Sequence, residues 1–139
     1  MIVIDASVVS KLFLPLEKYH QKSKEILRRH LQKLDDIIVP DLLYYEVANA
    51  LATKTSLPLV KILQDLSRLE IYNFSVEHLT IKNIQQASKL SKKYKVSVYD
   101  ASYAVLAEEK NCELVTADEK FVKQIGLPFV KSLQDYPSA

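Results

Sequence analysis

Glycine and cysteine are almost absent from this chain of 139 residues. It contains one glycine, Gly126, and one cysteine, Cys112. With so little glycine there is no P-loop and no GxGxxG motif, which excludes the common sites for nucleotide cofactors. A single cysteine excludes an internal disulfide and a cysteine-based zinc site. We interpret Cys112 as a buried or half-buried thiol.

Long apolar runs, a strong net charge and catalytic histidine patterns are also missing. The apolar runs are far shorter than the roughly 20 residues that cross a bilayer, and Asp5 interrupts the first strand too early for a signal peptide. We therefore expect a cytoplasmic protein without a membrane partner. The net charge of +2 excludes a histone-like polycation. His20, His30 and His78 stand in no zinc-ligand spacing, and no GxSxG motif is present.

Short apolar segments alternate with longer helical patterns along the chain. The predicted strands are 2–5, 36–39, 71–76, 113–116 and 127–130. The predicted helices are 6–14, 16–34, 42–54, 58–69, 77–94, 98–110 and 118–125. This alternation predicts an α/β fold, in which a short parallel sheet of about five strands carries helices on both faces. The length and the 48% hydrophobic content suit a single domain over residues 1–139.

Four acidic residues stand in apolar sequence, where an ordinary fold avoids them. Asp5 and Asp118 follow predicted strands, whereas Glu46 and Asp100 lie inside apolar helical segments. Carboxylates are rarely buried unless they are paired or bound to metal. Strand ends of a parallel sheet meet at one edge, where ligands bind at a topological switch point. If the fold gathers these four acids, their repulsion requires a hard cation that prefers oxygen, Mg²⁺ or Mn²⁺.

Each acid also has a structural alternative. Asp5 and Asp118 are suitable N-caps for the helices that follow them, so capping and metal binding both stay open. Glu46 shares an otherwise apolar helix face, and aspartate has a low propensity for helix interiors such as the one around Asp100. For these two we favour a functional role, with a surface ion pair as the alternative.

Polar and aromatic residues accompany the acids. Ser7, Asn49 and Thr116 lie two residues or one helical turn from an acid and can hydrogen-bond a carboxylate or a water. Taken singly, each is explained as a cap or turn residue. Four tyrosines also flank the acids, and packing explains most of them better than stacking on a nucleic-acid base does: Tyr44, Tyr45, Tyr99 and Tyr103.

The acids lie in four short blocks, residues 3–7, 46–51, 98–101 and 114–118. In this order, on an α/β frame of this size, the blocks resemble the PIN-domain family, and specifically its VapC-type toxin ribonucleases. The resemblance covers nearly the whole chain. It implies that the four acids are catalytic and hold one or two Mg²⁺ or Mn²⁺ ions, with three polar residues beside them. Carried over by position, the acids are Asp5, Glu46, Asp100 and Asp118, and the polar residues are Ser7, Asn49 and Thr116.

The resemblance also implies a substrate and partners. It implies an endoribonuclease that hydrolyses phosphodiester bonds in single-stranded or loop RNA, a homodimer, and a small antitoxin protein that silences the site. Exposed leucines and isoleucines in segments 16–34 and 57–63 are candidate contact surfaces, unless all of them are core. Two basic clusters can offset the repulsion between the acids and RNA, or simply form solvated helix faces: Lys24, Arg28, Arg29 and Lys33, then Lys89, Lys92, Lys93 and Lys95.

Other functions compete with this interpretation. A PIN-type nuclease of RNA maturation would have the same site, although the short chain without an appended domain favours the toxin. A non-catalytic metal-binding α/β module of the receiver type is disfavoured by Glu46 and Asp100, which lie inside helices. A haloacid-dehalogenase-like phosphatase needs a second aspartate two residues after the first, where this chain has Ser7.

Overall fold

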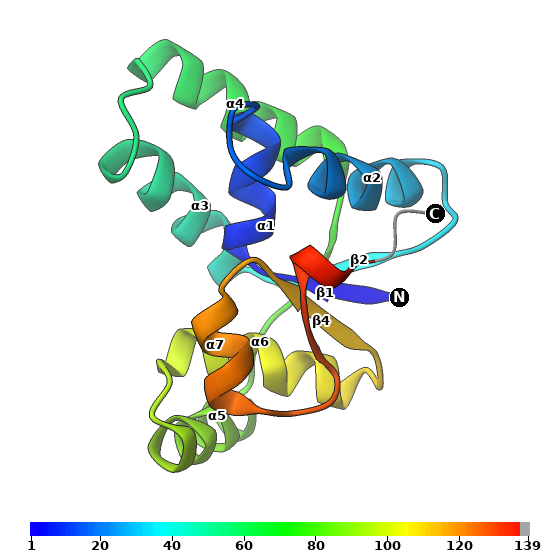
Figure 1. Cartoon of the computed structure of the whole chain (residues 1–139), viewed down its shortest axis with the longest axis vertical. Helices are drawn as coiled ribbons and strands as arrows, with labels where there is room; N and C mark the ends of the chain where they lie inside the picture. Colours follow the sequence, from blue (N-terminus) through cyan, green and yellow to red (C-terminus); the bar gives the residue numbers. More distant parts are fainter. Residues whose placement is uncertain (137–139) are drawn as a thin grey trace.

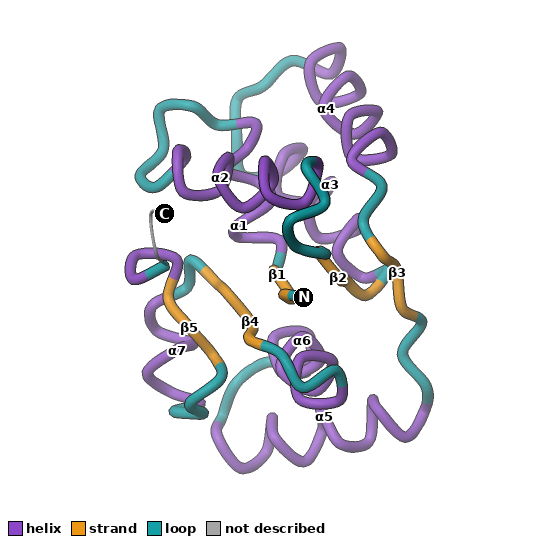
Figure 2. Tube along the Cα trace, turned by 90° about the vertical axis from the view of Figure 1, so that its right-hand side faces the viewer, coloured by secondary structure: helices purple, strands orange, loops and turns teal. Residues whose placement is uncertain are grey.

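Five parallel strands form the sheet at the centre of the computed structural model, which describes residues 1–136. The spatial order is β3-β2-β1-β4-β5, which Figure 2 shows from right to left. Every neighbouring pair is parallel. The predicted α/β fold with a five-stranded parallel sheet is confirmed. The strands are β1 (Ile2–Ile4), β2 (Ile37–Pro40), β3 (Ser75–Glu77), β4 (Glu113–Thr116) and β5 (Val130–Ser132).

Seven α-helices connect and cover the strands within residues 1–136. They are α1 (Ala6–Ser10), α2 (His20–Leu31), α3 (Leu42–Thr53), α4 (Leu59–Tyr72), α5 (Ile81–Tyr94), α6 (Val98–Glu109) and α7 (Glu119–Ile125). Two 3₁₀ turns, Lys11–Phe13 and Leu133–Asp135, complete the described part of the chain. None of these described helices has the length and apolar character needed to cross a membrane.

The strand order explains why helices lie on both faces of the sheet. The chain passes from β1 to β2 to β3 in one direction, and then returns across β1 to β4 and β5. Crossovers between parallel strands are right-handed, so reversing the direction moves the connecting helices to the opposite face. Figure 1 accordingly shows α1–α4 above the sheet and α5–α7 below it. The order therefore reverses between β1 and β4, which makes this point the topological switch of the sheet.

The core lies against the central strands. All residues of β1 and β2 are buried, as are the last three of β4, because helices cover both faces of these strands. Below the sheet, α6 packs on β1, β2 and β4, and it is buried continuously from Ala101 to Ala107. Because residues 101–107 are buried on all sides of α6, packing fixes the position of the helix. It thereby also places the first turn, which contains Asp100.

The predicted strand 71–76 is wrong in its first half. Helix α4 continues to Tyr72 and ends at Asn73, which adopts the left-handed backbone conformation with φ 54°. Strand β3 then begins at Ser75. Ile62, Asp65, Leu69 and Tyr72 share the face of α4 that packs on the rest of the protein, and this helical spacing outweighs the strand preference of Ile71 and Tyr72.

Other element boundaries also differ from the prediction, and α1 ends at Ser10 rather than at residue 14. Helix α5 begins at Ile81 rather than at residue 77, because Thr80 and Asn83 form a capping box that fixes its start. Helix α2 begins at His20 rather than at residue 16, after Tyr19 takes a left-handed conformation with φ 66°. Strand β5 is Val130–Ser132 rather than 127–130, since Gly126 ends α7 and the chain turns before pairing with β4.

Candidate active site

Asp5 stands directly after β1 and is 6% exposed. Its Oδ1 atom accepts hydrogen bonds from the Ser7 backbone N–H at 3.1 Å, the Ser7 hydroxyl at 2.5 Å and the Val8 backbone N–H at 3.3 Å. Asp5 is therefore the N-cap of α1, as the capping alternative predicts. Burial raises its pKa to about 6 despite the lowering effect of the Ser7 and Thr116 hydroxyls, and the charge of Asp100 raises it further.

Ser7 and Thr116 join the ends of β1 and β4. The Ser7 Oγ accepts a hydrogen bond from the Ala117 N–H at 2.9 Å and lies 3.3 Å from the Thr116 Oγ1. Thr116 in turn accepts a bond from the Asp118 N–H at 3.1 Å. The parallel register places Ile4 opposite Val115, so the segments that follow β1 and β4 leave the sheet side by side. This polar contact fixes Asp5 and Asp118 on the same edge of the sheet.

Asp118 is exposed and caps the last α-helix of the described chain. Its Oδ1 accepts a hydrogen bond from the Phe121 N–H at 3.0 Å, which makes it the N-cap of α7. The charge of Asp118 is close enough to Asp100 to raise the pKa of that residue. Asp118 therefore both caps a helix and belongs to the acidic group, and the same is true of Asp5.

Glu46 is held by a tyrosine from another helix. The buried Tyr103 of α6 donates its hydroxyl to the Glu46 Oε1 at 2.6 Å, across 57 positions of sequence. Burial raises the pKa of Glu46, the bond from Tyr103 lowers it, the charge of Asp100 raises it, and that of Lys54 lowers it. Burial and the charge of Glu46 also raise the pKa of the Tyr103 phenol, which therefore remains a proton donor.

Asp100 lies in the first turn of α6, where Ser97 caps the helix by accepting the Asp100 backbone N–H at 3.0 Å. Burial raises the pKa of Asp100, the Ser97 hydroxyl lowers it and the charge of Asp118 raises it. Charge repulsion thus couples Asp100 to Asp5, Glu46 and Asp118. The four predicted acids form one electrostatic group.

All four acids line a single cleft of about 440 Å³, which we call the acidic cleft. Asp5 and Asp118 come from the ends of β1 and β4, Glu46 from α3 and Asp100 from α6. The cleft therefore opens at the topological switch point, where ligands bind in open α/β sheets. Its wall also contains Ser7, Asn49 and Tyr103, together with Ser10, Lys11, Glu17, Lys54 and Thr55.

The donor set of the acidic cleft suits a hard divalent cation. Carboxylate oxygens are the ligands that Mg²⁺ and Mn²⁺ prefer. A cation would neutralise the buried and mutually repelling charges of Asp5, Glu46 and Asp100, whose pKa values burial and repulsion raise. As the side chains stand, however, no group of three or more His, Cys, Asp or Glu residues within residues 1–136 is arranged to hold a metal ion. The acids share a cleft, and a cation would have to draw them closer together.

Several residues of the cleft were not predicted from the sequence. Tyr103 was assigned to plain packing, although the position three residues after Asp100 is on the same helix face. Lys11 and Lys54, which follow Asp5 by six and Glu46 by eight residues, also line the cleft and were not predicted. Helical spacing from Asp100 could have identified Tyr103, whereas Lys11 and Lys54 lie past the ends of α1 and α3, where no same-face spacing marks them. Asn49 lines the cleft one turn after Glu46, and its role beside the acids stays a prediction.

Comparison with known proteins gives consistent matches. The family model described as PIN domain matches residues 2–126. Ribonuclease VapC3 of Pyrobaculum aerophilum is 28% identical over 129 residues, which cover 88% of this chain and 93% of that protein. Among solved structures, the fold is similar to Mycobacterium tuberculosis VapC20, described as a sarcin–ricin loop cleaving toxin, with a TM-score of 0.71 and 18% identity over 94% and 97% of the two chains.

A second solved structure, a toxin–antitoxin complex from Klebsiella pneumoniae, has a chain with the same fold. It gives a TM-score of 0.69 and 16% identity, over 96% of this chain and 98% of that one. At these identities the two structures establish the fold. The family-model match, which covers most of the sequence, carries the evolutionary relationship.

Proposed function

We propose that this chain, which belongs to the PIN-domain family, is a metal-dependent endoribonuclease that hydrolyses RNA phosphodiester bonds. We propose further that it is the toxin of a type II toxin–antitoxin pair. A cytoplasmic location goes with this proposal, because RNA is its substrate. A PIN-type nuclease of RNA maturation is the alternative, and it would use the same residues.

One observation carries the proposal: carboxylates from four separate elements line one cleft at the switch point of the sheet. Burial and mutual repulsion raise the pKa values of three of them. Keeping these carboxylates ionised in the cleft therefore costs folding free energy. Active sites are the places where such unfavourable clusters are retained.

In this proposal Asp5, Glu46, Asp100 and Asp118 hold Mg²⁺ or Mn²⁺. When bound, such an ion acts as a Lewis acid that neutralises negative charge on the phosphoryl group. The protein contributes the orientation of the ligands. Asp5 is fixed through its Oδ1 by three hydrogen bonds, so its other oxygen is left for the cleft. Glu46 is fixed in the same way by Tyr103.

Asp100 and Asp118 are our candidates for the general base, which is the carboxylate that the metal does not fully occupy. That carboxylate takes a proton from the attacking water as the water oxygen bonds to phosphorus. The bridging P–O bond breaks, and its electron pair stays on the leaving oxygen. Ser7, Thr116 and Asn49 keep the surrounding carboxylates and waters in position.

Partners are proposed on separate grounds. The solved relative from Klebsiella pneumoniae is part of a toxin–antitoxin complex, and helix α4 exposes a strip of apolar side chains: Leu59, Val60 and Leu63. Exposed apolar strips of this kind mark protein interfaces. Ile62 is buried, but Leu59 and Leu63 are exposed, so the alternative that all apolar residues of segment 57–63 are core is wrong. We propose that this strip contributes to a homodimer or to antitoxin binding.

The first test is cleavage of a mixed RNA pool with Mg²⁺ or Mn²⁺ by the wild type and by Asp100→Asn, with EDTA as a control. Loss of cleavage in both the variant and the EDTA sample supports a metal nuclease that uses Asp100. Glu108→Gln, which neutralises an exposed carboxylate on the same helix, should cleave like the wild type. Cleavage that persists in Asp100→Asn and in EDTA would contradict the proposal.

A further inference from the structure

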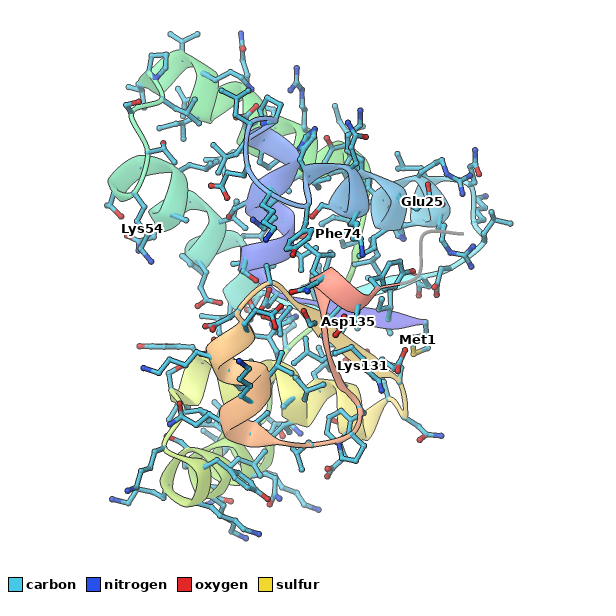
Figure 3. The ribbon with its side chains drawn as sticks, in the orientation of Figure 1. Met1, Glu25, Lys54, Phe74, Lys131 and Asp135 are labelled. Atoms are coloured by element: carbon cyan, nitrogen blue, oxygen red, sulfur yellow. The ribbon has the colours of Figure 1, made fainter. Side chains whose placement is uncertain are left out.

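Two lysines lie in the acidic cleft on the side away from the sheet. Lys11, directly after α1, and Lys54, directly after α3, both line the cleft that contains the four acids. Lys11 Nζ forms an ion pair with the Glu17 Oε2 at 3.2 Å, and its side chain is only 14% exposed, against 50% for Glu17. Figure 3 shows Lys54 near the outer end of α3. We call this part of the cleft the lysine end.

The lysine end lies farther along the helices than the acids do. Helices α1 and α3 pack against each other and leave the sheet edge together (Figure 1). Eight residues of helix, the separation of Glu46 and Lys54, rise about 12 Å along the axis. The positive charge of Lys54 still lowers the pKa of Glu46, so the two groups are within electrostatic reach of each other. Because the acids and both lysines line one cleft, an extended molecule in that cleft can contact both.

A buried hydroxyl without a partner also belongs to this region. Ser10 lines the cleft, is 9% exposed, and its Oγ has no hydrogen-bond partner among the described residues. A buried polar group without a partner costs free energy, about 1–3 kcal/mol. Such groups require an explanation, and a ligand oxygen is one. The hydroxyl of Ser10 and the ammonium groups of Lys11 and Lys54 are all donors, so a group rich in acceptor oxygens and negative charge suits them.

We infer that the lysine end is a phosphate subsite, in which Lys11, Lys54 and Ser10 hold a phosphate of the RNA backbone next to the one that is cut. This inference rests on the proposed nuclease function. The acids of the cleft repel a polyanion, so binding requires cations within reach of the neighbouring phosphates. Without RNA, Lys11 is paired with Glu17, whose carboxylate takes the place of the phosphate. When RNA binds, a backbone phosphate replaces the Glu17 carboxylate as the partner of Lys11.

This exchange predicts opposite effects for the two members of the ion pair. Lys11→Met keeps the apolar stem and removes the charge, so RNA affinity should fall about tenfold, the equivalent of one charge-assisted contact. Lys54→Met should weaken binding in the same way. Glu17→Gln frees Lys11 and removes a negative charge, so affinity should rise about threefold. Lys11→Arg should retain most of the affinity, because the positive charge remains.

The experiment measures binding of a short fluorescein-labelled single-stranded RNA of mixed sequence at several salt concentrations, by fluorescence anisotropy. Every variant is made in the Asp100→Asn background with Mg²⁺ present, so that the RNA stays intact. Lys82→Met is the matched control, because Lys82 is an exposed lysine of α5 that lies outside both basic clusters and does not line the cleft. Loss of one phosphate contact should lower the slope of log affinity against log salt by about 0.7. Thermal unfolding of each variant checks that it folds.

Each outcome decides the inference. Weaker binding by Lys11→Met and Lys54→Met than by Lys82→Met, with tighter binding by Glu17→Gln, supports the phosphate subsite. If the wild type cleaves RNA but both cleft lysine variants bind like Lys82→Met, only the subsite is refuted. If Glu17→Gln weakens binding as Lys11→Met does, the ion pair is structural and the exchange is refuted. If the wild type neither cleaves nor binds the RNA, the proposed function fails and the subsite with it.

Discussion

Replacing Asp5 with asparagine should stabilise the protein when no metal is present. Asparagine caps a helix about as well as aspartate, so the hydrogen bonds from Ser7 and Val8 to Oδ1 can persist. What disappears is a buried negative charge. Because burial raises the pKa of Asp5 from 3.8 to about 6, and one pKa unit corresponds to about 1.4 kcal/mol, the ionised carboxylate costs about 3 kcal/mol of folding free energy near neutral pH.

The pH dependence of this difference has a defined sign. The pKa of Asp5 is higher in the folded chain than in the unfolded chain, so protonation favours folding. That contribution is fully present below pH 3.8 and is lost as the pH rises through about 6. Asp5→Asn should therefore unfold like the wild type near pH 3.5. Its free energy of unfolding should be greater by about 2–3 kcal/mol above pH 7, which raises Tm by roughly 5–10 °C in a domain of this size.

The assay is thermal or urea unfolding in EDTA across this pH range, for the wild type, Asp5→Asn and the surface control Glu108→Gln. A second series with Mn²⁺ should raise Tm of the wild type and leave Asp5→Asn nearly unchanged, since binding to the folded state stabilises it. An Asp5→Asn protein less stable than the wild type at pH 7.5 in EDTA would refute the reasoning. It would mean that the carboxylate is a stabilising cap rather than a strained metal ligand.

Three further outcomes are expected. Tyr103→Phe removes the donor to Glu46 and keeps the ring in the core, so cleavage should fall about 10–100-fold while anisotropy shows unchanged RNA binding; full cleavage would show that Glu46 needs no support. Ser7→Ala leaves the Ala117 N–H without its partner and should cost about 1–3 kcal/mol in urea unfolding, together with cleavage activity; unchanged stability would contradict the link between the two strand ends. Leu63→Asp places a charge in the exposed strip of α4 and should convert a dimer to a monomer in light scattering without lowering Tm; a dimer that persists would show that the strip is not the dimer interface.

Much of the fold follows from local features of the sequence. Short apolar segments bounded by Pro40 or Gly126 predict strands and helix ends, because backbone preferences act over a few residues. The errors fall where two local preferences compete, as at Ile71 and Tyr72, which suit a strand but complete the buried face of α4. There, packing against the rest of the protein decided the outcome.

The candidate site was predictable in its carboxylates but not in its supporting contacts. Asp5, Glu46, Asp100 and Asp118 are conspicuous because each is a charge in apolar sequence, which is a local signal. No local signal pairs Tyr103 with Glu46, since the two residues lie on different helices and meet only when α3 and α6 pack around the sheet. The assignment of the four acids as metal ligands remains a prediction that the experiments above test.

By itself, then, the sequence determined the alternation of strands and helices, the caps at Asp5 and Asp118, and the acids that fit no ordinary core. Only the tertiary structure decided that β4 pairs with β1, which brings two strand ends more than 100 residues apart into contact through Ser7 and Thr116. It also decided that Lys11 and Lys54 share a cleft with the acids. The physical reason is that periodicity and capping record neighbours along the chain, whereas strand order depends on the packing of the whole chain and on the handedness of its crossovers.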